Sequence, residues 1–357
     1  MKRRGIAVAL MLALMLPAAR AWAAAWPGEG KGLLFAFECA ARGTAPLGPD
    51  GRPMPGFVLR PRGLARLDAH GRLLLRDGHF IAENLPDGVL AGVTKAEAFS
   101  IEVLITPEAS AVQDAVILAA GASRASSLFT LAQQGDKLVF SSGKAAATLC
   151  AVETGKTAHI VVCRGRDTIQ GYKDGKPVFS GPAPDSGAPR LAEGTLRVGG
   201  GLDGAGDWPG IVEHIAVYAR ALTAEEAAAH AAACAQAVAA RPVVPRLMLR
   251  AKLKGKSSVP TAAELAPYTQ SLSVFAYEVE RVTSGEYAPK TLYVAHWCVL
   301  DRTPLPFKDA ALDSSYDLVL EPFSANPQLE SENLNDQVIE DFSLPLYYDA
   351  GGLSLRR

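Results

Sequence analysis

Apolar and polar residues alternate in short runs over residues 99–218, which is the pattern of half-buried β-strands. The clearest run is 99–103, where Phe, Ile and Val are separated by Ser and Glu. Asp174 and Gly175 lie between two such runs and favour the positive φ angles of a type I′ hairpin turn. Further strands are expected at residues 32–38, 128–132, 137–140, 157–163, 195–200 and 207–218. The pattern therefore predicts an antiparallel β-sandwich.

The sandwich is expected to end in a helix that begins after Thr223. Glu226 follows three residues later, and this spacing is that of a capping box. The alanine-rich sequence that follows favours a helix to about residue 240. Two prolines then mark residues 241–245 as a linker. Residues 26–240 are therefore expected to form the first domain.

A second set of alternating runs begins at residue 246. Residues 247–254 alternate apolar side chains with Arg250, Lys252 and Lys254, so this strand has one basic face. A short proline-bounded helix is expected at 261–268, and strands are expected at 272–282, 292–299 and 318–323. This order favours a small closed β-barrel of OB-like type over residues 246–357. The fold class is therefore mostly β, a sandwich followed by a smaller barrel.

The end of the second domain is acidic. Residues 309–349 contain ten acidic residues and neither Lys nor Arg. Such runs are usually solvated and inert. The alternatives are docking against a basic surface, including the face formed by Arg250, Lys252 and Lys254, or binding of calcium. The spacing of an EF-type calcium loop is absent.

Residues 1–25 have the features of a signal peptide. Three basic residues precede an apolar run at 5–16, and Ala21, Trp22 and Ala23 supply a small-x-small cleavage pattern. The apolar run is too short to span a bilayer comfortably, and no second run approaches the required length. We therefore expect a periplasmic or secreted chain without a transmembrane segment. Removing residues 1–25 deletes four positive charges and changes the formal charge from −1 to −5, which argues against a nucleic-acid partner.

Five cysteines make an odd set for an oxidising compartment. Cys150 and Cys163 are placed to face each other across a hairpin. Cys39 and Cys234 lie near the two ends of the predicted sandwich, which are neighbours in this kind of fold. Buried free thiols explain the same residues equally well.

The sequence offers few catalytic groups. A glycosidase needs two carboxylates about 5 to 10 Å apart. Glu102 and Glu213 each stand alone on their predicted strands, so we predict no catalytic residue. His159 and His214 lie inside strands, where a structural role is the better interpretation. His296 belongs either to a functional rim or to the core of the barrel.

Candidate ligand-binding residues lie in and after the glycine-rich loop 199–207. Trp208 offers an aromatic platform for a sugar, although packing at the edge of the sandwich is the alternative. Asp203 and Asp207 have carboxylates that suit calcium or sugar hydroxyls, which makes calcium the candidate cofactor. Glycine lets a ligand approach the backbone closely, but the loop is also consistent with a flexible connection.

Four blocks of the sequence resemble the LamG-like jellyroll family of concanavalin A-like lectins. These blocks are residues 99–103, 129–140, 172–177 and 208–226. The last block is the most specific, because a strand, Tyr218, Arg220 and a capped helix follow in fixed order. The resemblance extends over residues 32–240. It implies a jellyroll fold that binds carbohydrate or protein, in some members through calcium.

The C-terminal part resembles a domain found behind such jellyrolls in exported bacterial proteins of unassigned function. The resemblance is carried by residues 267–268, 277–280, 284–287, 294–297, 318–323 and 345–348. Such proteins accompany exopolysaccharide assembly and acetylation. We therefore expect an exported, non-catalytic protein that binds a polysaccharide or an exported protein partner. The alternative is a glycan-active hydrolase or lyase on the same scaffold.

Overall fold

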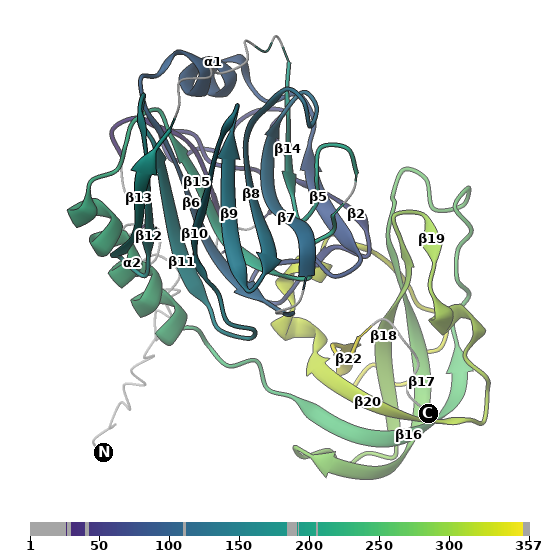
Figure 1. Cartoon of the computed structure of the whole chain (residues 1–357). Coiled ribbons are helices and arrows are strands. Elements are labelled where there is room, and N and C mark those ends of the chain that lie inside the picture. Colours follow the sequence, from purple (N-terminus) through teal and green to yellow (C-terminus); the bar gives the residue numbers. More distant parts are fainter. Residues whose placement is uncertain are drawn as a thin grey trace, which may run out of the picture.

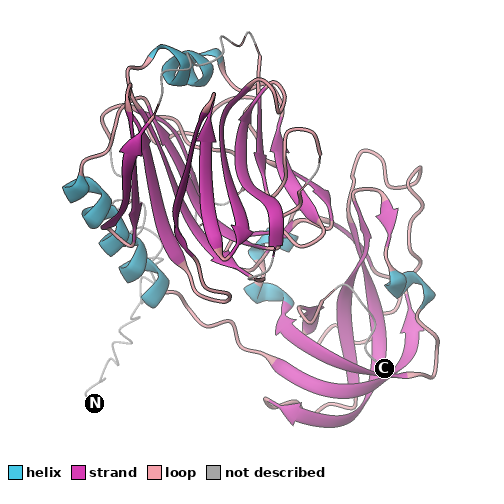
Figure 2. Cartoon of the chain, viewed as in Figure 1, coloured by secondary structure: helices cyan, strands magenta, loops and turns pink. Residues whose placement is uncertain are grey.

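The computed structural model describes residues 26, 30–39, 43–109, 112–183, 191, 193–204 and 206–352. The predicted signal peptide, residues 1–25, lies outside the described residues. Two β-rich domains follow each other along the chain and are joined by an extended segment after the long helix (Figure 1). Strands predominate in both domains (Figure 2). In the described part of the chain, no helix has the length and apolar composition needed to cross a membrane.

Two antiparallel sheets stack face to face in the first domain. The first sheet has the order β13 (Lys176–Pro182), β12 (Thr168–Lys173), β11 (Ala158–Arg164), β6 (Phe99–Pro107), β15 (Gly210–Tyr218), β4 (Leu73–Leu74) and β3 (Arg66–Leu67), and β1 (Leu33–Glu38) pairs with β15. The second sheet has the order β10 (Ala145–Ala151), β9 (Lys137–Ser142), β8 (Ser127–Gly135), β7 (Val112–Gly121), β14 (Thr195–Val198), β5 (Gly78–Ala82) and β2 (Arg60–Gly63). The predicted sandwich is confirmed.

The central strands β6, β11 and β15 of the first sheet are buried on both faces. On β6, Ile101, Val103 and Ile105 join the core between the sheets, and Leu104 belongs to a second apolar cluster on the opposite face. Helix α2 (Ala224–Ala239) covers that opposite face (Figure 1). Polar side chains on the outer face, such as Glu102, therefore lie in a closed layer beneath the helix.

Two local predictions are confirmed at the residue level. The amide of Glu226 donates to Thr223 Oγ1 at 3.2 Å, and the amide of Thr223 donates to Glu226 Oε2 at 2.8 Å, which completes the capping box. Asp174 and Gly175 have φ angles of 51° and 75° in the turn between β12 and β13. Helix α1 (Asp87–Lys95) was not predicted from the sequence.

The second domain closes into a five-stranded barrel. The ring runs through β16 (Leu247–Lys256), β17 (Ser271–Ser284), β18 (Thr291–Leu300), β22 (Leu346–Asp349) and β20 (Ser315–Pro322), and back to β16. The pairing of β18 with β22 is parallel and the other pairings in the ring are antiparallel. Numbered by their order in the chain, the strands follow each other around the ring as first, second, third, fifth and fourth. This arrangement is a Greek-key barrel, which confirms the predicted OB-like type. Two short strands, β19 (Thr303–Pro304) and β21 (Asn333–Asn335), extend the sheet.

The predicted helix at residues 261–268 is wrong. These residues form successive turns, and Pro260 and Pro267 leave too few residues between them to nucleate an α-helix. A short 3₁₀ helix, η2 (Pro306–Asp309), lies instead between β19 and β20. Its Phe307 is buried in the barrel core.

Part of the acidic segment pairs with the basic face of β16. Arg250 Nη1 donates to Asp317 Oδ1 at 3.1 Å, and Lys254 Nζ donates to Asp313 Oδ1 at 2.6 Å. Docking against the same domain's basic strand, which the sequence offered as an alternative to a solvated run, therefore describes these two aspartates. Exposed ion pairs of this kind contribute little to stability.

All five cysteines are free thiols, so neither candidate disulfide is formed and the free-thiol alternative describes the structure. Cys150 lies on β10 of the second sheet and Cys163 on β11 of the first sheet, so no hairpin brings them together. Cys39 and Cys234 are both buried and unbonded. Burial also raises the pKa of the Cys39 thiol to about 12, so it remains protonated.

Candidate functional site

The predicted aromatic platform is not at the surface. Trp208 is 0% exposed, and its Nε1 donates to Gln133 Oε1 at 2.7 Å. A Cβ at Gly210 would lie 2.2 Å from the indole, so this glycine is required for the packing. The prediction that Trp208 binds a ligand is therefore wrong, and its packing alternative describes what the structure shows.

Asp203 and Asp207 lie in the loop between β14 and β15, and each has a basic neighbour. Arg124 Nη1 donates to Asp203 at 3.3 Å, and His79 Nδ1 lies 4.0 Å from Asp207 Oδ1. Nowhere in the described residues do three or more His, Cys, Asp or Glu side chains gather around a potential metal position. The geometry therefore provides no cage for the calcium ion expected at these two aspartates.

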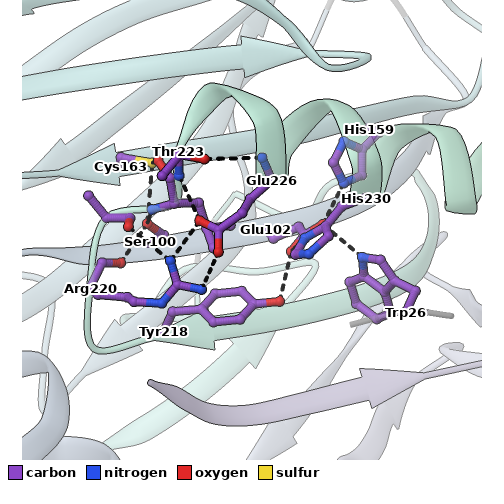
Figure 3. A network of polar contacts seen from close by, with 12 residues as sticks. Trp26, Ser100, Glu102, His159, Cys163, Tyr218, Arg220, Thr223, Glu226 and His230 are labelled. Carbon is purple, nitrogen blue, oxygen red and sulfur yellow. Dashed lines mark hydrogen bonds and ion pairs between the residues drawn. The ribbon is translucent and has the colours of Figure 1, made fainter. Parts of the chain in front are cut away.

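A group of titratable side chains surrounds Glu102 beneath α2 (Figure 3). Trp26 Nε1 donates to Glu102 Oε1 at 2.7 Å, and His159 Nε2 lies 2.6 Å from the same oxygen. Tyr218 donates its hydroxyl to Oε2 at 3.1 Å, and His230 Nδ1 on α2 lies 3.1 Å from Oε2. One carboxylate thus joins β6, β11, β15, α2 and the residue at position 26.

The charges in this network are arranged around the ionised carboxylate. Burial alone would raise the pKa of Glu102, but hydrogen bonds from His159 and His230 outweigh it and lower this pKa to about 2. Burial would lower the pKa of His230, but the hydrogen bond and charge of Glu102 raise it. His214 packs against Trp26, with ring centroids 4.5 Å apart, and burial lowers its pKa to about 3. The network therefore keeps the buried Glu102 carboxylate ionised and surrounds it with hydrogen-bonding partners.

This network is structural. Glu102 is completely buried, so a substrate has no access to it. His159 and His214 are both buried, which agrees with the interpretation of these histidines as structural residues. His296 is also buried, bonded to Tyr277 at 2.9 Å and to Asp349 at 3.0 Å, so it belongs to the barrel core rather than to a functional rim.

A cleft of about 440 Å³ lies between the two domains. Its walls come from the β3–β4 turn at residues 68–72, from the chain that connects the domains at residues 238–246, and from barrel residues 321–326 and 348–350. Ligand sites in proteins commonly have volumes of about 300–1,000 Å³ and often lie at domain interfaces. Its volume and its position make the cleft a candidate binding site.

A buried carboxylate anchors the first wall of the cleft. Glu213 on β15 is fully buried and forms an ion pair with Arg241 of the connecting segment. Arg72 Nη1 lies 3.6 Å from Glu213 Oε1, and Arg72 Nε donates to Asp68 Oδ2 at 2.6 Å. Burial alone would lower the pKa of Arg72, but the charges of Asp68 and Glu213 outweigh burial. The net effect is a pKa above the ordinary value, so Arg72 is always charged.

The barrel supplies the opposite wall. Arg246 Nε donates to Glu321 Oε1 at 3.1 Å, and Asn326 Nδ2 donates to Glu321 Oε2 at 3.3 Å. Asn326 also donates to the carbonyl of Pro322 at 3.1 Å, which fixes its amide. Each charged side chain of this wall is therefore held by a second group.

The family match covers much of the first domain. The family model described as the concanavalin A-like lectin/glucanases superfamily matches residues 78–228. The first domain is a concanavalin A-like jellyroll. The match ends inside α2, so the connecting segment and the barrel lie beyond it.

Solved structures resemble the chain at low sequence identity. The binding domain of botulinum neurotoxin DC, in complex with rat synaptotagmin II, is 11% identical, with 82% of this chain and 77% of that chain covered at a TM-score of 0.46. A Trypanosoma rangeli sialidase is 16% identical, with 58% and 33% covered at a TM-score of 0.39. A pentraxin from Limulus polyphemus is 16% identical, with 42% and 73% covered at a TM-score of 0.33. No curated protein matches the sequence. Because these TM-scores are all low, the resemblances to solved structures give no information about the function of this chain.

The cleft residues were not among the predicted site residues. The sequence alone suggests Glu213 only as a potential catalytic carboxylate and Arg241 only as part of a linker. Arg72 and Glu321 carried no signal of their own, because single charged residues beside turns are common on protein surfaces. The jellyroll and the barrel must first be folded and joined before these side chains come together at one cleft.

Proposed function

We propose that this chain is a non-catalytic carbohydrate-binding protein whose ligand occupies the cleft between the jellyroll and the barrel. The observation that carries the proposal is the set of three cleft arginines, each held by a carboxylate. Guanidinium groups donate hydrogen bonds and carboxylates accept them, so together they match the hydroxyl groups of a sugar. The match to a superfamily of lectins and glucanases supports a carbohydrate ligand.

The cleft lacks the features of a glycosidase. Such an enzyme needs a carboxylic acid with a raised pKa beside a second carboxylate. Burial raises the pKa of Glu38 to about 7 and also raises that of Glu332, but neither residue lines the cleft. The carboxylates at the cleft are already engaged by arginines. Glu102 and Glu213 occupy separate buried positions, and neither lies in an open groove.

Export and an accessory role belong to the same proposal. The signal-peptide pattern of residues 1–25 supports a location in the periplasm or outside the cell. The resemblance of the C-terminal part to domains of exported bacterial proteins supports a role beside exopolysaccharide assembly. Cell fractionation of a bacterial host that expresses the full chain tests this location. We expect the chain in the soluble periplasmic fraction or in the medium.

The binding proposal is tested with the mature chain and a panel of neutral and acidic oligosaccharides. Arg246→Ala removes an exposed guanidinium from the cleft, and Arg281→Ala removes an exposed guanidinium from the barrel surface outside it. We expect calorimetric binding to at least one saccharide, lost in the first variant and retained in the second. Equal binding by both variants, or no binding to the panel, would contradict the cleft as the site.

A further inference from the structure

The ion pairs at the cleft expose their guanidinium groups more than their carboxylates. In each pair the guanidinium side chain is more exposed than the carboxylate: 22% against 16% for Arg72 and Asp68, 15% against 0% for Arg241 and Glu213, and 63% against 8% for Arg246 and Glu321. In the pairs of Arg241 and Arg246 the carboxylate is nearly buried, so a ligand reaches the guanidinium group more easily than the carboxylate.

Two of these guanidinium groups have unused donors. Within the described residues, Arg246 uses Nε for Glu321, and Arg241 uses one terminal nitrogen for Glu213. A guanidinium has five N–H donors in a planar fork, so most of the donors of both residues are left for a ligand. The planar fork binds a carboxylate through two parallel hydrogen bonds, which are stronger than those to a neutral group.

The remaining surface of the cleft suits a sugar ring. The pKa of His70 is lowered by burial, which outweighs the charge of Asp68, so its imidazole is neutral at pH 7 and suits a hydroxyl group. Pro242 and Val243 add aliphatic surface from the connecting segment. Because three carboxylates balance the three arginines, the cleft has no large excess of positive charge to hold a highly phosphorylated ligand.

We propose that the ligand is an acidic sugar, such as a hexuronate unit of a polysaccharide, whose carboxylate is bound by the free guanidinium edges of Arg241 and Arg246. This inference rests on the proposed carbohydrate-binding function and specifies the class of sugar. His70 contacts a ring hydroxyl, and the connecting segment covers one face of the ring.

The test compares a polyuronate oligosaccharide with the same oligosaccharide after its carboxyl groups have been reduced to alcohols. Calorimetry on the mature chain is expected to give an affinity for the acidic form higher by about tenfold or more, because hydrogen bonds to a charged group are stronger. Equal affinity for the two forms overturns the acidic-sugar inference and leaves the binding function standing. No affinity for either form, together with none for the neutral panel, overturns both.

Two variants localise the effect. Arg246→Gln keeps a polar side chain of similar length and leaves Arg241 in place, so it is expected to reduce the affinity for the acidic form toward that for the reduced form. Val243 lines the cleft and is 92% exposed, so Val243→Glu places a negative charge there that repels the carboxylate of the ligand. Val178→Glu places the same charge on the exposed edge strand β13, away from the cleft. We expect only the Val243 variant to weaken binding of the acidic form.

The reduced oligosaccharide is the internal control for folding. A variant that binds the reduced form normally has an intact cleft, so a selective loss of the acidic form reports the charge interaction. If Val243→Glu and Val178→Glu weaken binding of the acidic form equally, the carboxylate does not bind in this cleft and the inference is wrong.

Discussion

Glu102 shows how a single buried residue organises the jellyroll. Its carboxylate is completely buried, yet it accepts hydrogen bonds from Trp26 and Tyr218 and contacts His159 and His230. A buried charge without such partners would cost several kcal/mol of stability. The sequence indicated correctly that no second acidic residue accompanies Glu102 on its strand. It did not indicate the partners, because they come from four other parts of the chain.

Replacing this carboxylate by an amide tests the importance of the network. Glu102→Gln keeps the size of the side chain but removes the charge, and its NH₂ group then faces the histidine or indole donors. We expect the free energy of unfolding to fall by about 3–5 kcal/mol, as for other broken buried ion pairs. Urea denaturation measures the change. Glu153→Gln, which affects only an exposed pair with Lys156, is expected to leave stability nearly unchanged, and an equally small effect at Glu102 would contradict this account.

The same network sets a dependence of stability on pH. The pKa of Glu102 falls from its ordinary 4.5 to about 2 in the folded chain, so its contribution is complete above pH 4.5 and is lost as the pH falls toward 2. The pKa of His230 is raised above its ordinary 6.5, so its contribution is complete below pH 6.5 and is lost as the pH rises through the folded pKa.

The stability contributed by the network is therefore greatest between about pH 4.5 and 6.5. Thermal unfolding measured from pH 3 to pH 9 is expected to show both limbs in the wild-type chain. Glu102→Gln removes both the titrating carboxylate and the partner of His230. The difference in melting temperature between the wild-type chain and this variant should therefore narrow toward both extremes of pH. A constant difference across the range would assign the pH dependence to other groups.

At the scale of elements, α2 is the part of the fold that the sequence specified best. The capping box at Thr223 and Glu226 involves residues three positions apart, so local sequence was sufficient to predict it. Arg220 strengthens the same terminus, because two of its nitrogens each donate to a carboxylate oxygen of Glu226 at 2.7 Å. The helix in turn covers the polar layer around Glu102.

Removal of the cap tests whether this local signal stabilises the domain. Thr223→Ala loses the side-chain acceptor for the Glu226 amide, and we expect a loss of about 1 kcal/mol in the free energy of unfolding. Thr223→Ser retains the hydroxyl and is the matched control, with stability close to that of the wild type. Equal losses in the two variants would show that the methyl group, rather than the cap, is responsible.

Elements that depend on distant packing were predicted less well. The alternation of residues 99–103 and the turn at Asp174 and Gly175 were sufficient for β6 and the β12–β13 hairpin, because these patterns are local. Burial of Trp208 was only an alternative from sequence, because it requires the close approach of Gly210 and a bond from Gln133, which lies 75 positions away. The thiols of Cys150 and Cys163 are separated by their assignment to different sheets, which sequence spacing does not reveal.

At the scale of the molecule, the cleft depends on how the jellyroll and barrel are joined. The amide of Gly63 donates to Asp301 Oδ2 at 3.0 Å, which links the β2 end of the jellyroll to the turn after β18. Leu64 packs against a barrel cluster that includes Trp297 and Tyr348. These contacts lie beside the cleft, and the ion pairs of Arg241 and Arg246 secure the connecting segment. The candidate site therefore required tertiary structure and could not be located from spacing along the chain.

Separation of the domains should destroy the cleft without unfolding either domain. Leu64→Glu places a carboxylate against Trp297 and Tyr348, where it has to be desolvated, so the contact is expected to open. Interfaces between domains in one chain are commonly small enough for such motion. Small-angle scattering should show a larger radius of gyration for Leu64→Glu than for Leu312→Glu, which alters an exposed barrel leucine, while both variants keep the circular dichroism of the wild type. Because the walls of the cleft come from both domains, saccharide binding should weaken with the separation, and an expanded variant that binds normally would place the ligand elsewhere.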